Sequence, residues 1–516
     1  MKLLRLKNRK RKFIFLAVLI SSVLIVKILV WDTENNRWLI QDLYYRPSID
    51  AKLTIATPIT SISSINDRSL KTPTVINDAS KLNQTQVAAV FQPTNIEEIK
   101  SLIKFAKTQG KKISMSGARH SMAGQIVSSD SIHLSMLKFD RISYNQTDRT
   151  VTVQSGATWK QIQNELGKSD RAVRVMQDSN IFTVGGSIAV NAHGKDPRFG
   201  SLIESVNFFK LINPEGEEIK CSRAENPELF RAAIGGMGLF GAIAEVNLKT
   251  DINSTYNYTV VHRPSSEMVV FMESQVKRPE LEGIEAQMSV DRSNFLEEAQ
   301  IYYFDRTATN PNLKDDVMGE NSIWLRKLVY RTSRNTDWGK QFRWFMQKNV
   351  GPTLDPTQLT RNSSMAAPFR TLDLNDPSTT DILQEYFVPI SQVDRFLAEY
   401  KKIIRSHDIQ LINVTVRKVN RDNEALVSYA TEDMYAFVAY YKIARDKSGD
   451  IQMSAFTQEM MDYLLSIDAK FYLAYRGYYT KDQLYAMYPK LQELFALKRQ
   501  LDRDEIFSNK WYEEFR

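Results

Sequence analysis

Along residues 85–250, apolar side chains recur with the spacing of helices in some segments and of strands in others. The pattern predicts a helix that begins at the capping-box sequence Thr94–Glu97 and ends at Gly110. A second helix is predicted over Thr158–Leu166, with Thr158 and Gln161 as its capping box. The strand-like segments are Lys111–Met115, Val151–Val153, Val206–Ile212, Glu218–Cys221 and Ala242–Leu248. We interpret this part as an α+β or α/β domain.

From residue 255 to about 490 the pattern changes to longer helices with aromatic-rich strands between them. Long helical patterns cover Val393–Ile404 and Gln483–Phe495. Strand-like runs cover Leu411–Val416, Met434–Tyr441 and Phe471–Tyr475. This part is interpreted as a second α+β domain, and the fold class of the chain as α+β.

The first 31 residues have a different character. Residues 1–12 hold seven basic side chains, and residues 13–31 form an apolar run that contains a single charge, Lys27. About 20 apolar residues span a bilayer, and basic residues beside such a segment stay in the cytoplasm. A cleaved signal peptide would need a shorter apolar core and a small-residue cleavage site, so we favour an uncleaved transmembrane helix. We expect a single-pass membrane protein with a cytoplasmic tail (1–12), an anchor (13–31), a linker (32–80) and a catalytic domain on the periplasmic or extracellular side.

The charge of the chain is concentrated in that basic tail. The tail supplies seven of the eight net positive charges, so the remainder of the chain is close to neutral. A nucleic-acid-binding protein carries its basic residues as a patch on the folded part, and we therefore expect no nucleic-acid partner. Cys221 is the only cysteine, which excludes an intrachain disulfide and a thiolate metal site, and we assign no metal ligands.

Two glycine-rich loops carry the densest chemical signal. In Ser114–Gln125 a strand runs into a turn of small residues, and in Thr183–Gly194 the glycines let the backbone approach a ligand closely. Two such loops in one domain indicate a large phosphorylated cofactor. Gly236–Gly241 has the spacing of the dinucleotide fingerprint, but a helix precedes it and a strand-like segment follows it. This order is the reverse of the one a Rossmann site requires, so we reject that site.

The motifs around these loops resemble the vanillyl-alcohol oxidase superfamily of flavoproteins, whose FAD-binding domain is called the PCMH type. In chain order they are Gln92-Pro93-Thr94, Gly117-x-x-His120-Ser121-x-x-Gly124-Gln125, Thr183–Gly194, and Asn226–Phe230 with Gly235–Gly238. Near the C-terminus, Lys498–Asp502 and Phe507–Trp511 resemble the segment by which the chain of this family returns to the FAD domain. The chain is most similar to the bacterial aldonolactone and alditol oxidase branch, although the His120 loop alone equally resembles cytokinin dehydrogenases.

The resemblance implies a two-subdomain PCMH-type FAD-binding domain over residues 81–251, a substrate or cap domain over residues 252–495 and a return to the FAD domain over residues 496–516. It also implies which residues bind FAD: Ser116, Gly117, Ala118, Arg119, His120, Ser121, Gln125, Thr183, Gly185, Gly186, Ser187, Asn191, Gly194 and Ile243.

In relatives with histidine at the position of His120, the imidazole is bonded to the 8α-methyl carbon of the flavin, so the resemblance implies covalent FAD. The alternative is a histidine that only hydrogen-bonds to the flavin. Some relatives add a cysteinyl bond just before the second loop. Ile181 or a neighbour stands there in this chain, so any linkage is single. His193 is expected to have a structural role.

Candidate catalytic residues come from the second domain. In the aldonolactone and alditol oxidases a Glu-x-Arg strand lies over the flavin, and Asn413–Arg417 resembles it with Arg417 retained and Thr415 in place of the glutamate. Threonine cannot be the same base, which leaves lactone and polyol specificity open. Tyr475 and Arg476 lie where a second basic segment of the family falls. Arg417, Tyr475 and Arg476 are therefore the predicted catalytic residues.

The implied activity is oxidation of a CH–OH group of a small sugar lactone or polyol, as in a D-arabinono-1,4-lactone oxidase, with hydride transfer to FAD. The electron acceptor is oxygen, or, in a dehydrogenase, a quinone or protein. Such a dehydrogenase could act on a lipid-linked sugar, a sterol-like molecule or an amine, as the cytokinin enzymes do. A catalytically idle flavin-binding protein is the third alternative. The sequence does not indicate the oligomeric state.

Overall fold

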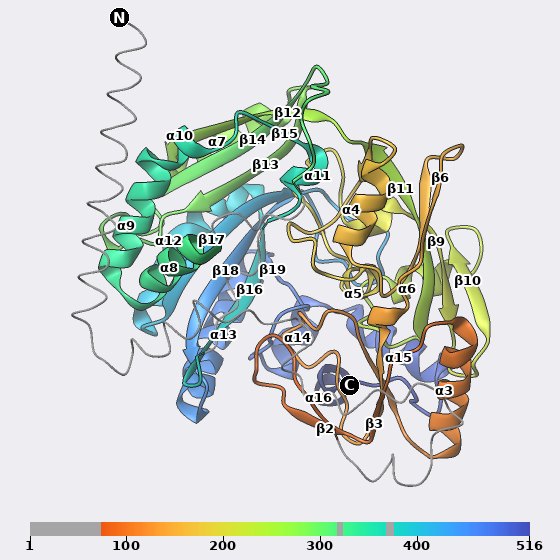
Figure 1. Ribbon diagram of the computed structural model, residues 1–516. Coiled ribbons are helices and arrows are strands. Elements are labelled where there is room, and N and C mark those ends of the chain that lie inside the picture. Colours follow the sequence, from red (N-terminus) through yellow and green to blue (C-terminus); the bar gives the residue numbers. More distant parts are fainter. Residues whose placement is uncertain (1–73, 317–322, 368–375) are drawn as a thin grey trace, which may run out of the picture.

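The computed structural model describes residues 74–316, 323–367 and 376–516. The basic tail and the predicted transmembrane segment lie outside these residues. Within the described ranges, no helix is both long enough and apolar enough to cross a membrane. Helices and strands are mixed in both halves of the chain, as the sequence predicts (Figure 1).

The first part of the chain forms a small parallel sheet. Its strands β3 (Ala89–Phe91), β4 (Ile113–Ser116) and β5 (Ile132–Ser135) lie in the order β3-β5-β4. Helix α3 (Ile96–Thr108) packs its apolar stripe against them. The predicted capping box at Thr94–Glu97 is wrong by one residue, because the Asn95 side chain accepts from the Glu98 amide. Asparagine at this position satisfies a free amide of the first turn.

A larger antiparallel sheet follows. Its strands have the order β10-β9-β11-β7-β6, and β8 pairs with the end of β11. Their bounds are β6 (Ile142–Asn145), β7 (Thr150–Gln154), β8 (Arg171–Val173), β9 (Val206–Ile212), β10 (Glu218–Ser222) and β11 (Ala242–Ile252). The helices α4 (Trp159–Gly167), α5 (Val184–Ala189) and α6 (Pro227–Ala233) accompany this sheet. The capping box of Thr158 and Gln161 at the start of α4 is confirmed.

The fold begins earlier than the predicted linker allows. Strand β1 (Thr74–Ile76) pairs with β2 (Thr85–Val87), and its alternating burial leaves Val75 exposed. The expectation that residues 32–80 are all linker is therefore wrong at its C-terminal end, because this strand buries Thr74 and Ile76.

The second part of the chain is built on an eight-stranded antiparallel sheet within the described residues, in the order β15-β12-β14-β13-β17-β18-β16-β19. The bounds are β12 (Thr255–Pro264), β13 (Leu281–Met288), β14 (Glu298–Thr307), β15 (Gln358–Thr360), β16 (Thr379–Pro389), β17 (Gln410–Val419), β18 (Met434–Ala444) and β19 (Lys470–Phe471). The predicted strand Phe471–Tyr475 is mostly wrong, since only its first residue is in β19.

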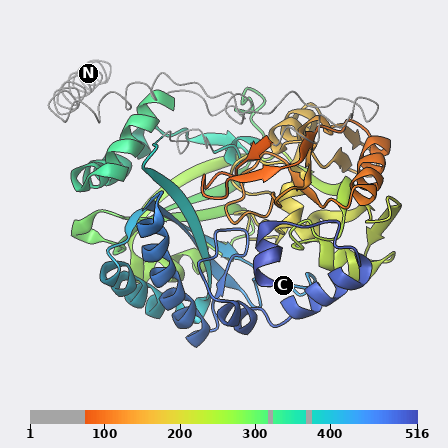
Figure 2. The ribbon, with the colours of Figure 1, turned by 90° about the horizontal axis from the view of Figure 1, so that it is seen from below.

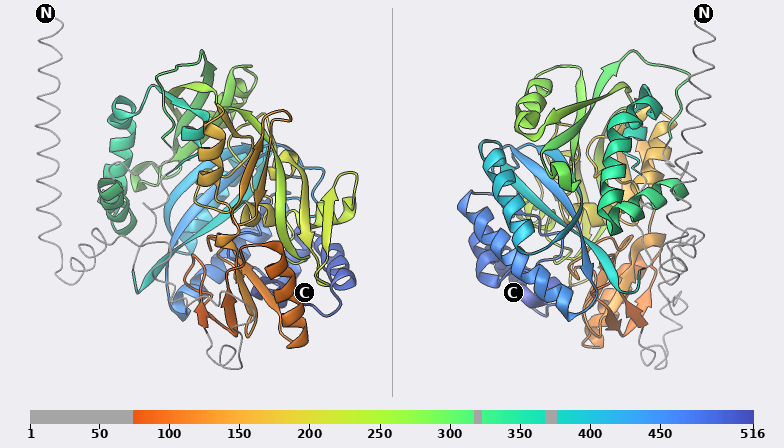
Figure 3. Two further views of the ribbon diagram at one scale, coloured as in Figure 1. Left: turned by 45° about the vertical axis from the view of Figure 1, so that its right-hand side comes forward. Right: turned by 90° about the vertical axis from the view of Figure 1, so that its left-hand side faces the viewer.

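Helices cover this sheet on two sides, which Figure 3 shows in its right-hand view. Helices α12 (Val393–Ser406) and α13 (Lys447–Ser466) pack on β16 and β18, and α7 (Ser265–Val276) packs on β12–β14. On the other side lie α8 (Ile323–Asn335) and α9 (Asp337–Asn349), followed by the short α10 (Gly351–Leu354) and α11 (Arg361–Ser364).

The predicted helix Gln483–Phe495 is two helices, α14 (Lys481–Met487) and α15 (Leu491–Leu501). Pro489 lies between them. Proline has no amide proton and disfavours helical geometry in the residue before it, and Tyr488 accordingly has ψ 72°. The last helix is α16 (Lys510–Phe515).

The C-terminal segment lies against the first domain, as Figure 2 shows from below. Phe507 forms a parallel bridge with Ile113 of β4, and the Asn509 side chain donates to the Met237 carbonyl at 3.0 Å. Asp502 accepts from the amides of Ile506 and Phe507 and is ion-paired with the fully buried Lys498. This ion pair fixes the turn that brings the chain back to β4.

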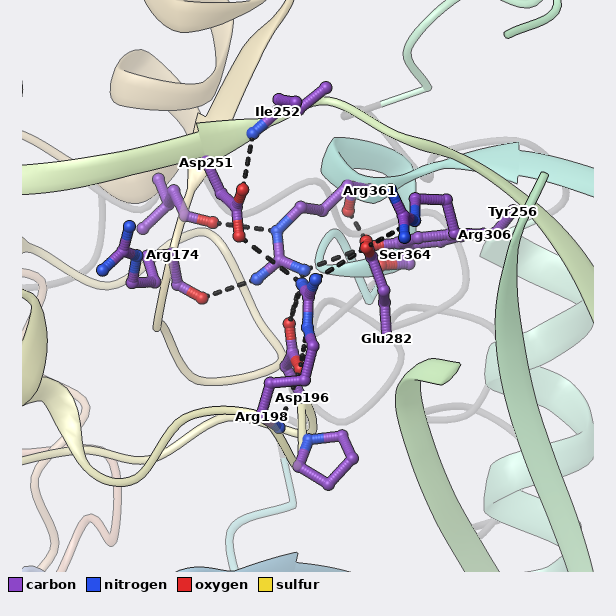
Figure 4. Close-up of polar contacts among 12 residues, drawn as sticks. Arg174, Asp196, Arg198, Asp251, Ile252, Tyr256, Glu282, Arg306, Arg361 and Ser364 are labelled. Atoms are coloured by element: carbon purple, nitrogen blue, oxygen red, sulfur yellow. Dashed lines mark hydrogen bonds and ion pairs between the residues drawn. The ribbon is translucent and has the colours of Figure 1, made fainter. Parts of the chain in front are cut away.

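A buried arginine joins the two large sheets (Figure 4). Arg361, on the helix after β15, donates to the carbonyls of Val173 at 3.2 Å and Arg174 at 2.6 Å. It also donates to Asp196 Oδ2 at 2.6 Å and to the Tyr256 hydroxyl at 3.0 Å. Its guanidinium therefore connects a segment of the second domain to a strand and a loop of the first.

Candidate active site

A cavity of about 730 Å³ lies where the two glycine-rich loops of the first domain face the eight-stranded sheet. One wall is formed by residues 115–122, Phe182, Thr183, residues 185–187, Met237, Gly238, Gly241 and Ile243. The opposite wall is formed by side chains of β13, β16, β17, β18 and α9. Both parts of the chain thus contribute to one site.

The first loop leaves β4 as a tight turn. Arg119 in this turn has a φ of 60°, a conformation that few residues other than glycine adopt. The buried His133 of β5 fixes the start of the loop, because its Nδ1 lies 2.9 Å from Ser114 Oγ and its Nε2 lies 2.8 Å from Ser116 Oγ. Burial lowers the pKa of His133 well below 6.5, so the ring is neutral.

His120 lies on the cavity wall directly after this turn. Its ring makes an edge contact with Phe182, at 4.8 Å between centroids. Burial lowers the pKa of His120 to about 4. At neutral pH the imidazole is therefore uncharged and carries a lone pair on one ring nitrogen.

The two loops touch at Gly117 and Thr183. A Cβ on Gly117 would lie 1.9 Å from Thr183 Oγ1, so only glycine allows this close approach. Gly185 is similarly close to Ser155, at 2.7 Å from its Cβ to the position of an added Cβ. The glycines thus keep side chains out of the space between the loops.

The donor set of this wall fits a large polar cofactor. The hydroxyls of Ser121, Ser155 and Ser179 and the Gln177 Oε1 are buried and line the cavity, and among the described residues they have no hydrogen-bond partner. Buried polar atoms without partners carry a desolvation penalty, which a bound ligand removes. These atoms and the open backbone at Gly117 would hold the cofactor.

Most of the predicted cofactor residues line this cavity. They are Ser116, Gly117, Ala118, Arg119, His120, Ser121, Gln125, Thr183, Gly185, Gly186, Ser187 and Ile243. Asn191 and Gly194 do not line it. Asn191 instead donates to Asp422 at 2.8 Å and accepts from the Ile203 amide, and the space beside Gly194 is filled by the Met176 carbonyl.

Arg417 lies on the opposite wall within a cluster of four charges. Its guanidinium is 3.3 Å from Glu285 Oε2 and 3.3 Å from Asp178 Oδ2, and Lys195 Nζ bridges the same two carboxylates at 2.8 and 2.7 Å. Burial opposes the charge of Arg417, but Asp178 and Glu285 outweigh it and raise its pKa above the usual value. Burial likewise opposes ionisation of Asp178, and Lys195 and Arg417 outweigh it and lower its pKa.

Next to this cluster are two groups that can exchange a proton. His193 Nε2 lies 2.6 Å from Glu385 Oε1, and both residues line the cavity. Tyr475 lies on the same wall, and burial, together with the Glu385 carboxylate, raises its pKa well above 10. Gln125 of the first loop donates to the carbonyls of Leu473 and Ala474 at 3.0 and 3.1 Å, which fixes the segment that carries Tyr475.

Arg476 points elsewhere. It donates to Asn83 Oδ1 at 2.9 Å and is 3.5 Å from Asp450, and it is not among the residues that line the cavity. Of the three predicted catalytic residues, the structure brings Arg417 and Tyr475 together and leaves Arg476 outside.

The far end of the cavity is a network of neutral amides that the sequence did not indicate. Gln347 donates to Gln287 at 2.9 Å, Gln287 donates to Asn413 at 2.6 Å, and Asn413 donates to Thr415 at 3.2 Å. Arg343 of α9 also donates to the Asn413 side chain. The residues of this network come from two strands and one helix, so no local sequence pattern could have revealed it.

Comparisons with known proteins match two different families of sequence to the two parts of the chain that line the cavity. A family model described as "FAD binding domain" matches residues 87–222, and one described as "D-arabinono-1,4-lactone oxidase" matches residues 375–515. The chain is similar to the L-gulonolactone oxidase of Bos taurus, with 21% identity over 82% of this chain and 94% of the relative. It is also similar to the D-arabinono-1,4-lactone oxidase of Candida albicans, with 29% identity over 31% of this chain. The matched stretch spans about a third of the length of the fungal relatives.

Proposed function

Because the chain belongs to the vanillyl-alcohol oxidase superfamily of FAD-dependent oxidoreductases, with similarity to its aldonolactone oxidases, we propose that it oxidises a CH–OH group of a sugar lactone or polyol-like substrate. The observation that carries this proposal is the shared cavity. It is lined on one side by both glycine-rich loops and on the other by Arg417, Tyr475 and Glu385. Bound FAD would supply the hydride acceptor between these walls.

Arg417 would stabilise the substrate oxygen as the C–H bond is broken. Its charge is permanent, and Asp178 and Glu285 hold its side chain from two sides. A fixed cation that points at an oxygen with developing negative charge lowers the barrier without reorganisation during the reaction. Tyr475, which stays protonated, would donate a hydrogen bond to the same oxygen.

The hydroxyl proton needs an acceptor, and Thr415 cannot provide one. Of the carboxylates that line the cavity, Asp178 is neutralised by Lys195 and Arg417, and its lowered pKa makes it a weak base. Among the described residues, the Glu385 carboxylate forms no ion pair with lysine or arginine and is paired with an imidazole, at 2.6 Å between His193 Nε2 and Glu385 Oε1. The Glu385 and His193 pair is therefore our candidate for holding the proton.

Anaerobic reduction tests this function directly. The purified full chain, in detergent, is mixed without oxygen with a panel of aldonolactones and polyols, and the flavin absorbance near 450 nm is followed. We expect at least one of these donors to bleach the flavin. An absorbance that no lactone or polyol changes, while a chemical reductant bleaches it fully, would contradict the proposed substrate class and would favour a flavin-binding protein without this activity.

The same sample distinguishes an oxidase from a dehydrogenase. We infer an oxygen-type acceptor from the similarity to lactone oxidases. Mixing the reduced protein with oxygen should then restore the absorbance within seconds and release one hydrogen peroxide per flavin. Slow reoxidation by oxygen together with fast reoxidation by a soluble quinone would instead assign the chain as a quinone-linked dehydrogenase.

We further propose that FAD is bonded to His120. A neutral imidazole with a pKa of about 4 is a competent nucleophile, and His120 lies on the cofactor wall of the cavity. His120 would supply the ring nitrogen and FAD the 8α carbon. The new bond would replace one N–H and one C–H bond, and the two protons and two electrons released would pass to oxygen, the acceptor inferred above. Mass spectrometry of the peptide that contains His120 should show the added mass of FAD, and complete release of FAD by acid would refute the bond.

The proposed location of the enzyme rests on residues 1–31 alone, which lie outside the described residues. We propose that residues 13–31 anchor the chain in a membrane with the catalytic domain on the periplasmic or extracellular side. The full chain should stay in the membrane pellet after alkaline carbonate extraction, and a variant that lacks residues 1–31 should be released. Release of the full chain would contradict the anchor, and protease protection of the catalytic domain in inside-out vesicles tests its side.

A further inference from the structure

Arg343 differs from Arg417, another cation that lines the cavity, because among the described residues no carboxylate lies within ion-pair distance of it. Among the residues that the structure describes, it forms no ion pair, and its guanidinium donates to neutral oxygens: the Ile412 carbonyl at 3.1 Å and the Asn413 side chain. Arg417, on the same cavity, is held by two carboxylates. Arg343 has five donor hydrogens, so two bonds leave most of its donors available.

Burial of the Arg343 guanidinium without a carboxylate partner among the described residues carries a desolvation penalty. Burial lowers the pKa of Arg343, and the groups that act in the opposite direction are the phenols of Tyr330 and Tyr302, not a carboxylate. Tyr330 also lines the cavity. A guanidinium in such surroundings is stabilised when an anion arrives, and arginine binds carboxylate and phosphate through two parallel hydrogen bonds.

The position of Arg343 sets how far the anion lies from the reacting carbon. Arg343 contacts Ile412 and Asn413 of β17. Arg417 lies four residues after Asn413 in the same strand and therefore on the same face of it. Four residues of an extended strand cover about 13 Å. Thr415 and the amide network of Gln287, Asn413 and Gln347 occupy the interval and offer neutral donors and acceptors.

From this geometry we propose that the substrate is a polyhydroxylated anion, whose carboxylate or phosphate binds Arg343 while the oxidised CH–OH lies at Arg417. The hydroxyl groups between the two ends would bind the amide network. This subsite rests on the proposed function for the identity of the reacting end. The strand between Asn413 and Arg417 covers about 13 Å, which exceeds the length of one sugar ring, and we therefore expect an acidic or phosphorylated oligosaccharide unit rather than a simple aldonolactone.

Matched ligand pairs test the subsite without requiring turnover. Binding of lactobionate against lactitol, and of trehalose 6-phosphate against trehalose, is measured on the full-length holoprotein in detergent at low salt, by calorimetry and by the flavin difference spectrum. We expect the anion of at least one pair to bind about tenfold or more tightly than its neutral partner. The pair that shows the preference tells carboxylate from phosphate.

Variants assign the preference to one side chain. Arg343→Gln should reduce it to within about twofold, and Arg343→Lys, which keeps the charge but loses the paired donors, should retain part of it. The control is Arg405→Gln, which removes the same charge from the exposed end of α12 and should leave the preference unchanged. If Arg343→Gln does not fold, the wild-type pairs and Arg343→Lys decide.

Equal affinity within both pairs, or no binding of either anion, overturns the subsite. An anion preference that Arg343→Lys and Arg343→Gln both leave intact overturns its assignment to Arg343. These outcomes are independent of the proposed function. If neutral lactones bleach the flavin and no ligand pair shows a charge preference, the proposed function is supported and the anion subsite is refuted. If the preference depends on Arg343 but no lactone or polyol bleaches the flavin, the subsite is supported and the proposed function is refuted.

Discussion

The contact between Gly117 and Thr183 gives the sharpest prediction about cofactor binding. A methyl group on Gly117 would lie 1.9 Å from Thr183 Oγ1 and 2.9 Å from both Thr183 Cβ and Cγ2. Rotation of the threonine side chain can move Oγ1 and Cγ2 but not Cβ. The substitution Gly117→Ala must therefore push the two loops apart, and both loops line the wall that we assign to FAD.

The magnitude follows from the overlap. Non-bonded heavy atoms pack at about 3.5 Å, so the overlap is roughly 1.6 Å with Oγ1 in its present rotamer and roughly 0.6 Å with Cβ, which no rotation relieves. Overpacking by one methyl group costs about 1–3 kcal/mol, and an overlap of this size belongs at the upper end. If the loops must adopt the wild-type spacing to bind FAD, about 3 kcal/mol corresponds to binding that is roughly 100-fold weaker.

The assay is FAD affinity, measured by quenching of flavin fluorescence in an His120→Ala background so that a covalent bond does not mask the equilibrium. Gly117→Ala should weaken binding roughly 100-fold, and Thr183→Gly should restore it to within about threefold of Thr183→Gly alone, because all three close atoms are removed. Thr183→Ala should rescue only in part, since Cβ stays at 2.9 Å.

The control is Gly200→Ala, whose added methyl group would meet nothing closer than 3.5 Å. Unchanged FAD affinity in Gly117→Ala would refute the reasoning. A loss that Thr183→Gly does not rescue would also refute it.

Three further predictions concern the remaining parts of the molecule. Arg361→Met should lower the free energy of unfolding by about 3–5 kcal/mol, because it leaves the buried partners of this guanidinium unpaired. The control is Arg306→Met, which removes a side chain that is 56% exposed beside Glu282 and should change the free energy of unfolding by less than about 1 kcal/mol. Equal losses for the two variants in urea titrations would show that Arg361 does not hold the two sheets together. Burial lowers the pKa of His133, so below pH 6.5 the imidazole is protonated in the unfolded chain but not in the folded one. Protonation therefore stabilises the unfolded state, and the free energy of unfolding falls as the pH drops below 6.5. Between pH 7 and 5 the wild type should therefore lose about 2 kcal/mol more than His133→Gln, and parallel pH profiles would disprove this. Arg417→Met should slow flavin reduction by roughly 100-fold or more, and Arg476→Met should have little effect. If stopped-flow measurements instead show the larger loss for Arg476→Met, Arg476 and not Arg417 is the catalytic arginine.

Local sequence signals led to the two loops that line one wall of the cavity. Glycines in the two loops mark positions where backbone must approach backbone or ligand, and this requirement can be read from a short segment, as at Gly117. Helix periods and capping residues are also local, and the errors there were small. The cap at Asn95 was misplaced by one residue, and the break at Pro489 was overlooked although proline indicates it directly.

The substrate side could not be predicted in the same way. Glu285 is opposite Arg417 only because β13 pairs with β17 in one register, and Asp178 reaches the same cluster from the first domain. Arg343 is on a helix that is far from β17 in the sequence, and nothing near it suggested a binding role. Strand register and helix docking are decided by the packing of the whole domain, so the identity of these residues had to come from the three-dimensional structure.

The placement of charge along the cavity also bears on the missing glutamate of the Glu-x-Arg strand. The lining carboxylates Asp178 and Glu385 lie near Arg417, whereas the Arg343 end has none among the described residues. Thr415 lies between the two ends, so a carboxylate there would repel an anion on its way to Arg343 and would compete for the guanidinium. A neutral side chain at this position fits a polyhydroxylated anion. Thr415→Glu, which introduces the glutamate found in the relatives, should therefore weaken the binding of lactobionate or trehalose 6-phosphate more than the binding of lactitol or trehalose. An equal loss of affinity for both members of each pair would show that the side chain at position 415 does not affect the charge preference.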